Sequence, residues 1–212
     1  MTPRKPILNS KQHDAVRDWW RSLQPIEKNA KPPPDWLLGL GRADRAHLRR
    51  CACLDELLSQ RAALLLAKML IARNGDLWVL PDNETTYRRL AWVAGVLAMV
   101  KEDLRDGCTL TWHLGRSADA DRPVMNEQRF QRLERTRDID DLFIQWRRAV
   151  RLADGKADVA QLADDLLTWQ IELDAPSQRP NAVRFHWAYD YYLTTRDQAT
   201  ADKPSTDKES DQ

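Results

Sequence analysis

Arginine residues recur at helical intervals in two stretches of the chain, and their guanidinium groups are the side chains best suited to bind an anion. In Gly41–Arg50, four arginines accompany a single acid, Asp44. At about 100° per residue, Arg42, Arg45 and Arg49 project within one narrow arc of a helix. A solvated helix face usually places acids four residues from its bases. The stretch therefore favours a binding face for a polyanion, with a solvated surface face as the alternative.

A second basic set lies on the next two predicted helices, away from their apolar stripes. Arginine is used here in preference to lysine, and its planar fork can hold phosphate oxygens with two parallel hydrogen bonds. Nearby acids, Glu127, Glu134, Asp140 and Asp141, could pair with several of these arginines, and the pattern leaves that alternative open. The members of this second set are Arg129, Arg132, Arg135, Arg147, Arg148 and Arg151.

Other side chains could support metal or acid–base chemistry, but their patterns are incomplete. His47 and Cys51 are spaced i, i+4, whereas a structural zinc site normally needs four ligands. Asp138, with Asp140, Asp141, Asp164 and Asp165, could be imagined in a two-metal nuclease site. Asp138 is better explained as a helix N-cap with Asp141 in the first turn. We therefore predict no catalytic residues, no metal and no cofactor.

Composition limits the classes of partner. The chain has 212 residues, with 33 basic and 32 acidic side chains and a formal net charge of +1. A polyanion would therefore have to meet local patches rather than a globally basic protein. Three cysteines imply no disulfide framework. No apolar run resembles a signal peptide or approaches the roughly 20 residues of a membrane span, so we predict a cytoplasmic protein without membrane contact.

The hydrophobic periodicity predicts an all-α fold. We expect a helical bundle, which could consist of two small helical lobes that share a core. Trp92, Trp146 and Trp169 fall on apolar helix faces and are expected in the core. The expected helices cover residues 10–24, 42–50, 54–73, 84–104, 126–136, 138–152, 157–171 and 182–195. The expected organisation is a flexible N-terminus (1–9), an N-terminal helical lobe (10–106), a connection (107–125), a C-terminal helical lobe (126–196) and a disordered tail (197–212).

Five short segments, in this order, resemble the CasB family, the small subunit of Cascade, the RNA-guided surveillance complex of type I-E CRISPR systems. The similarity covers residues 10–195. It depends on the order of the segments, the helical content and the length, because each segment is short and built from common residues. The segments are Asp44–Arg50, Arg129–Leu133, Trp146–Arg148, Asp165–Trp169 and Trp187–Tyr192.

The resemblance implies a non-catalytic, all-α subunit that sits as two copies along the belly of Cascade. The implied partners are guide RNA, both strands of target DNA, the large subunit, the backbone subunits and a second copy of the chain. A helical protein–protein adaptor whose arginines meet acidic protein surfaces remains the alternative. The residues that match by position are Arg45, Arg49, Arg50, Arg129, Arg147 and Arg148; helical geometry adds Arg42, Arg132, Arg135 and Arg151.

Three features depart from the family pattern. They are the proline-rich linker that begins at Lys31, the longer loop 172–181 and the polar C-terminal tail. These departures bear most directly on where the final helix lies.

Overall fold

The computed structural model describes residues 4–25, 34–75, 80–116, 122–175 and 182–201, with side chains described as far as residue 194. Within these ranges the fold is built from helices, so the predicted all-α class is confirmed. The last residues of the predicted tail, 202–212, lie outside the described residues.

The chain forms its helices in two successive groups. The first contains α1 (Ser10–Ser22), the 3₁₀ turn η1 (Asp35–Leu37), α2 (Arg42–Arg50), α3 (Leu54–Leu58), α4 (Arg61–Ala72) and α5 (Glu84–Leu97). The second contains α6 (Leu110–Gly115), α7 (Glu127–Arg135), α8 (Ile139–Leu152), α9 (Val159–Asp174) and α10 (Val183–Ala201).

Two short strands lie close to where the two groups meet. β1 (Glu102–Asp103) and β2 (Lys156–Ala157) pair in parallel, with Glu102 opposite Lys156. The sequence pattern did not predict them, because two residues are too few to show alternation. Gly155 precedes β2 with φ 77°, a left-handed backbone that glycine adopts without strain.

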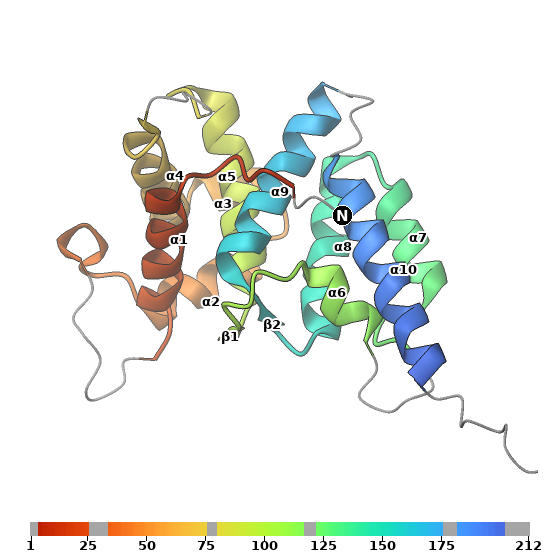
Figure 1. The fold of residues 1–212 in the computed structure, drawn as a ribbon. Helices are drawn as coiled ribbons and strands as arrows, with labels where there is room; N and C mark the ends of the chain where they lie inside the picture. The colour runs from red at the N-terminus through yellow and green to blue at the C-terminus, as the bar shows by residue number, and fades with distance from the viewer. Residues whose placement is uncertain (1–3, 26–33, 76–79, 117–121, 176–181, 202–212) are drawn as a thin grey trace, which may run out of the picture.

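Helix α9 joins the two groups into one molecule. In Figure 1, α1 to α5 lie on one side of α9 and α6, α7, α8 and α10 lie on the other. Helix α9 packs against α1 and α5, and also against α10. The predicted C-terminal lobe therefore shares one of its helices with the predicted N-terminal lobe, and one continuous apolar cluster runs through both.

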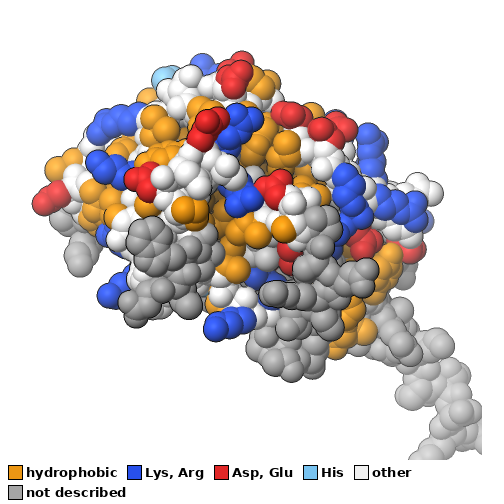
Figure 2. Space-filling view, turned by 90° about the horizontal axis from the view of Figure 1, so that it is seen from above, with side chains coloured by type: hydrophobic (Ala, Val, Ile, Leu, Met, Phe, Trp, Pro, Cys, Tyr) orange, Lys and Arg blue, Asp and Glu red, His pale blue; other side chains and the backbone are white. Residues whose placement is uncertain are grey.

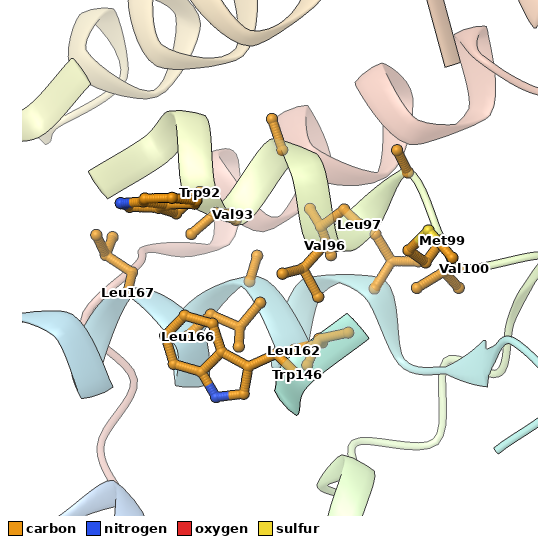
Figure 3. Packing of buried hydrophobic residues seen from close by; sticks show 14 of the residues in the cluster. Trp92, Val93, Val96, Leu97, Met99, Val100, Trp146, Leu162, Leu166 and Leu167 are labelled. Carbon is orange, nitrogen blue, oxygen red and sulfur yellow. The ribbon is translucent and has the colours of Figure 1, made fainter. Parts of the chain in front are cut away.

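The centre of that cluster is the α5–α9 contact. Figure 3 shows Trp92, Val93, Val96 and Leu97 of α5 facing Leu162, Leu166 and Leu167 of α9, with Trp146 of α8 beside them. Trp146 and Trp169 are fully enclosed, and Trp92 is buried. The prediction of these tryptophans as core residues is confirmed.

Side-chain caps define several helix starts. Asn9, Asn83, Asn126 and Asp158 each accept a hydrogen bond from a backbone N–H in the first turn of the helix that follows. Asp138 does the same for α8, accepting from the N–H of Asp141 at 2.9 Å. Its predicted role as an N-cap is confirmed.

Some helix boundaries differ from the expected ones. The expected helix 54–73 is interrupted at Ser59 and Gln60, where the Ser59 hydroxyl donates to the Asp55 carbonyl. The expected helix 84–104 ends at Leu97, because side chains from other elements bind the carbonyls that follow it. The expected connection 107–125 contains α6, and α10 continues past its expected end to Ala201.

Residues 4–9, expected to form most of a flexible N-terminus, lie against α9 in the structure. The side chain of Arg4 is only 7% exposed and pairs with Asp164 and Asp165, which are buried. Leu8 is buried, and its N–H donates to Asp164 at 2.7 Å. This segment crosses α9 in Figure 1.

Candidate nucleic-acid interface

Helix α2 is a short amphipathic helix held by one buried leucine. Leu48 is fully buried, whereas Arg42, Arg49 and Arg50 are exposed. The only acid of the stretch, Asp44, accepts a hydrogen bond from the Gly41 N–H at 2.9 Å at the helix start. That carboxylate forms no ion pair with a described residue, so the exposed positive charge is not compensated within α2.

Arg45 has a different environment from its neighbours on α2. Its guanidinium donates to the carbonyls of Ala98 at 3.0 Å and Val100 at 2.6 Å, and to the side chain of Gln24 at 2.7 Å. Burial, together with the nearby charge of Arg49, lowers the pKa of Arg45. Arginine still remains charged, so Arg45 binds the carbonyl end of α5, where the helix dipole is negative.

Arg147 of α8 binds the carbonyl end of α2 in a similar way. Its guanidinium donates to the carbonyl of Cys51 at 2.7 Å and to the carbonyl of Arg49. It lies 5.0 Å from the ring centre of Phe143, within range of a cation–π contact. Burial, followed by the charge of Arg151, lowers the pKa of Arg147. Arg147 therefore joins α2 to α8.

Four other predicted arginines surround a hollow between α7 and α8. Arg129 and Arg132 come from α7, and Arg148 and Arg151 come from α8; all four line the hollow with at least part of the side chain open to solvent. The hollow has a volume of about 440 Å³. Buried Phe130 and Leu133 fix α7 against the core, which keeps the arginines on the outer side. We call these four residues the α7–α8 surface.

Arg135 lies farther along α7. With Arg132, Gln128, Gln131 and Thr136 it lines a second, shallower hollow of about 500 Å³. The structure therefore brings Arg129, Arg132, Arg148 and Arg151 together and places Arg135 at their margin.

Within the described residues, none of the ten predicted arginines forms an ion pair with an acid. The pairing that the sequence left open is not observed there. Glu127 instead accepts hydrogen bonds from Gln131 at 2.9 Å and Tyr192 at 3.2 Å. Because no described acid pairs with them, the guanidinium groups of the α7–α8 surface remain available to an external anion.

Several arginines elsewhere on the molecule are paired with acids. Arg88 pairs with Glu84, Arg89 with Asp174, and Arg21 with Asp18. Arg88 and Arg89 line the hollow of about 680 Å³ between α5, α8 and α9, which also contains Asp55 and Asp140. The view from above shows acidic, basic and hydrophobic side chains interspersed on one face of the molecule (Figure 2). These pairs contrast with the unpaired arginines of α2, α7 and α8, although Arg61, Arg73 and Arg137 also contact a carbonyl or a sulfur rather than an acid.

The α2 and α7–α8 arginines are neighbouring parts of one face. Arg147 contacts the backbone of Arg49, and the charges of Arg49 and Arg151 both act on Arg147. We call Arg42, Arg49 and Arg50 the α2 surface.

Three of the five carboxylates considered for a nuclease, those of Asp138, Asp164 and Asp165, have structural partners. Asp164 and Asp165 are enclosed beneath Arg4, and the indole N–H of Trp187 donates to Asp165 at 2.9 Å.

Of the two residues considered as zinc ligands, Cys51 donates to the backbone carbonyl of His47, 3.3 Å away. Within the described ranges, no cluster of three histidine, cysteine or acidic side chains is arranged to hold a metal ion.

Two residues beside the α7–α8 surface were not predicted from the sequence. Gln145 and Leu152 line the same hollow as Arg148 and Arg151. Gln145 lies one helical turn before Arg148, and that i, i+3 spacing would have indicated a shared face. Neither residue is charged, so a search for basic residues omits them.

Comparison with known proteins agrees with this architecture. Residues 44–192 match the family model for the CRISPR-associated protein Cse2. Two similar solved structures are CasB from Thermus thermophilus and a Cse2-family CRISPR-associated protein from the same species. Each is 25% identical with a TM-score of 0.54, and each alignment covers 85% of this chain and 97% of the other. No curated protein matches significantly.

The fold and the matched span define an all-α CRISPR-associated protein. The chain belongs to the CasB (Cse2) family, the small subunit of Cascade. The described part of the chain contains no helix long and apolar enough to cross a membrane.

Proposed function

We propose that this protein is a non-catalytic, nucleic-acid-binding small subunit of a cytoplasmic type I-E Cascade. In this role it stabilises the pairing of guide RNA with target DNA and holds the displaced DNA strand. Its protein partners in the proposal are the large subunit, the backbone subunits and a second copy of itself. The single observation that supports nucleic-acid binding is the face of unpaired arginines on α2, α7 and α8.

Seven of the ten predicted arginines contact the nucleic acid in this proposal, namely the three of the α2 surface and the four of the α7–α8 surface, while Arg135 lies at the margin. Arg45 and Arg147 instead hold α2 and α8 in place, because their guanidinium groups are already bound to backbone carbonyls. Arg50 also donates to a carbonyl, that of Ala46 at 3.1 Å, but remains exposed. Guanidinium–phosphate contacts position a strand without reading its bases, so guide pairing supplies the sequence specificity.

Salt dependence of DNA binding tests the proposal. The affinity should fall steeply with salt, with a log–log slope of about 0.7 to 0.9 for each phosphate contact. The variant Arg129→Gln/Arg148→Gln should bind more weakly and show a smaller slope. A matched control is Arg21→Gln/Arg88→Gln, which removes the same charge from two exposed, acid-paired arginines.

Circular dichroism would confirm that both double variants remain folded. Equal losses of affinity in the two variants would show that only net charge matters. Wild-type affinity in Arg129→Gln/Arg148→Gln would exclude the α7–α8 surface as the contact.

A helical protein–protein adaptor is the second candidate, and a different surface favours it. Phe185, Tyr189, Tyr192 and Leu193 are exposed on α10, with Phe185 50% exposed. Large exposed apolar side chains on one helix are typical of protein contacts. An adaptor would have little affinity for any polynucleotide, so the same titration distinguishes the two functions.

A further inference from the structure

The hollow of the α7–α8 surface has a property that phosphate binding does not require. Besides the four arginines and Gln145, the residues that line it are apolar: Leu152 is half-buried, and Met125 and Leu133 are buried. The aliphatic parts of the arginine side chains add to this lining. Phosphate has no apolar surface, and an open row of arginines would suffice to hold it.

One polar group in the hollow has no partner. Gln145 is half-buried, and its amide makes no hydrogen bond within the described part of the chain. The amide has two donors and an acceptor, and glutamine can bond to the edge of a nucleobase through both kinds of group. The hollow thus combines an apolar floor, a free amide and four unpaired cations.

We propose that this hollow binds one unpaired nucleotide of a single-stranded nucleic acid. The base lies on Leu152 and the arginine stems, its edge bonds to Gln145, and the flanking phosphates contact Arg129 and Arg148. A base inside a duplex is stacked and paired, so it cannot enter. The inference depends on the proposed function and adds to it that one base, and not the phosphate backbone alone, contacts the protein at this site.

Charge decides between a nucleotide and an apolar protein side chain as the occupant. A protein side chain would cover the four guanidinium groups without supplying a counter-charge, and removing charges from water is costly. A nucleotide supplies its own phosphates, and planar bases stack well on guanidinium groups. The arginine rim therefore favours the nucleotide.

The test compares two oligonucleotides of equal length and charge, one of thymidines and one of abasic sites. Both have the same phosphates, so phosphate contacts alone predict equal affinity. Base insertion predicts about fivefold tighter binding of the thymidine strand, the lower end of the contribution of one stacked base. Fluorescence anisotropy at one fixed salt concentration measures both affinities.

Variants locate the effect in the hollow. Leu152→Ala and Gln145→Ala should each bring the two affinities closer together and leave the affinity for the abasic strand nearly unchanged. Two variants are needed because Leu152 also packs against the core, so Leu152→Ala could act through stability. Thermal melting of each variant confirms that it is folded. Leu64→Ala, an exposed leucine on α4, is the matched control and should keep the full ratio.

The outcomes separate this inference from the proposed function. Equal affinities of the wild type for both strands overturn the base site and leave phosphate binding intact. A preference that persists unchanged in both variants overturns it too, because the base then binds elsewhere. No affinity for either strand would contradict the proposed function, and the nucleotide site with it.

Discussion

Arg4 makes the most enclosed charge contact described in the molecule. Its guanidinium pairs with Asp165 at 2.7 Å and also with Asp164, both inaccessible to solvent. Burial raises the pKa of Asp165 to about 6, even though the charge of Arg4 and the hydrogen bond from Trp187 oppose that rise. Because its folded-state pKa exceeds the unfolded value, Asp165 favours folding at low pH, and this contribution is lost as pH rises from about 4 to about 6.

Replacing Arg4 should therefore destabilise the protein in a pH-dependent way. In Arg4→Ala the buried carboxyl groups lose their cation: the pKa of Asp165 rises further, and the pKa of Asp164 is no longer lowered by Arg4. Charging the two groups at high pH therefore becomes costly. We expect the free energy of unfolding to fall by about 3 to 5 kcal/mol at pH 8, and by clearly less at pH 5, where Asp165 is mostly protonated. Urea unfolding at the two pH values measures the difference.

The exposed pair Arg21–Asp18 provides the control for that experiment. Arg21→Ala should change stability by less than about 1 kcal/mol at either pH. An equal loss at pH 5 and pH 8 in Arg4→Ala would mean that ionisation of the buried pair does not determine the effect.

The structural roles of Arg45 and Arg147 could not be predicted from the sequence. The sequence predicted that Arg45 and Arg49 share one helix face, and α2 has that geometry. It could not show that the carbonyls of Ala98 and Val100, more than 50 residues away, lie beside Arg45. A guanidinium suits a phosphate and a helix C-terminus equally well, so tertiary structure alone separates the two roles. Substitutions at Arg45 or Arg147 would report folding rather than binding.

At the scale of the element, the helices with strong periodicity and capping residues were predictable. The bounds of α2 match the expectation, and α8 begins after the Asp138 cap as expected. Helix α6 was not predicted, since it has only six residues, begins shortly after Gly107 and ends in Gly115. Its packing against α10 stabilises it, and that contact depends on residues about 80 positions apart, such as Thr109 and Asp190.

Gly115 permits this close contact between α6 and α10. A Cβ at this position would lie 2.7 Å from the backbone carbonyl oxygen of Tyr191, which cannot rotate away. We therefore expect Gly115→Ala to lower the free energy of unfolding by about 1 to 3 kcal/mol, as overpacking does, despite the higher helix propensity of alanine. Urea unfolding of the variant measures the loss.

Gly41→Ser is the matched control for Gly115→Ala. No atom lies within 4 Å of the added Cβ, and the backbone there is extended, which any residue can adopt. Serine is also a good N-cap, so stability should be unchanged or slightly higher. Wild-type stability in Gly115→Ala would show that the two helices can separate without cost.

At the scale of the whole molecule, a net charge of +1 conceals an uneven distribution. Acids pair with arginines on α1 and α5, whereas the α2 and α7–α8 surfaces have no such pairs within the described residues. Composition alone could not show this separation, because it depends on which acids fold next to which bases. Arg147 connects the two surfaces through the backbone of Arg49.

If the two surfaces form one path, the length of the bound strand should decide how many arginines contribute. A short single-stranded oligonucleotide should bind the α7–α8 surface alone, and a longer one should also reach the α2 surface. The slope of log affinity against log salt should therefore increase with length and then become constant. Arg49→Gln should reduce that slope by about 0.7 for long strands only, whereas Arg148→Gln should reduce it at every length. Titrations of a length series at several salt concentrations measure both effects. If Arg49→Gln behaves like the wild type at every length, a single strand does not extend from α8 to α2.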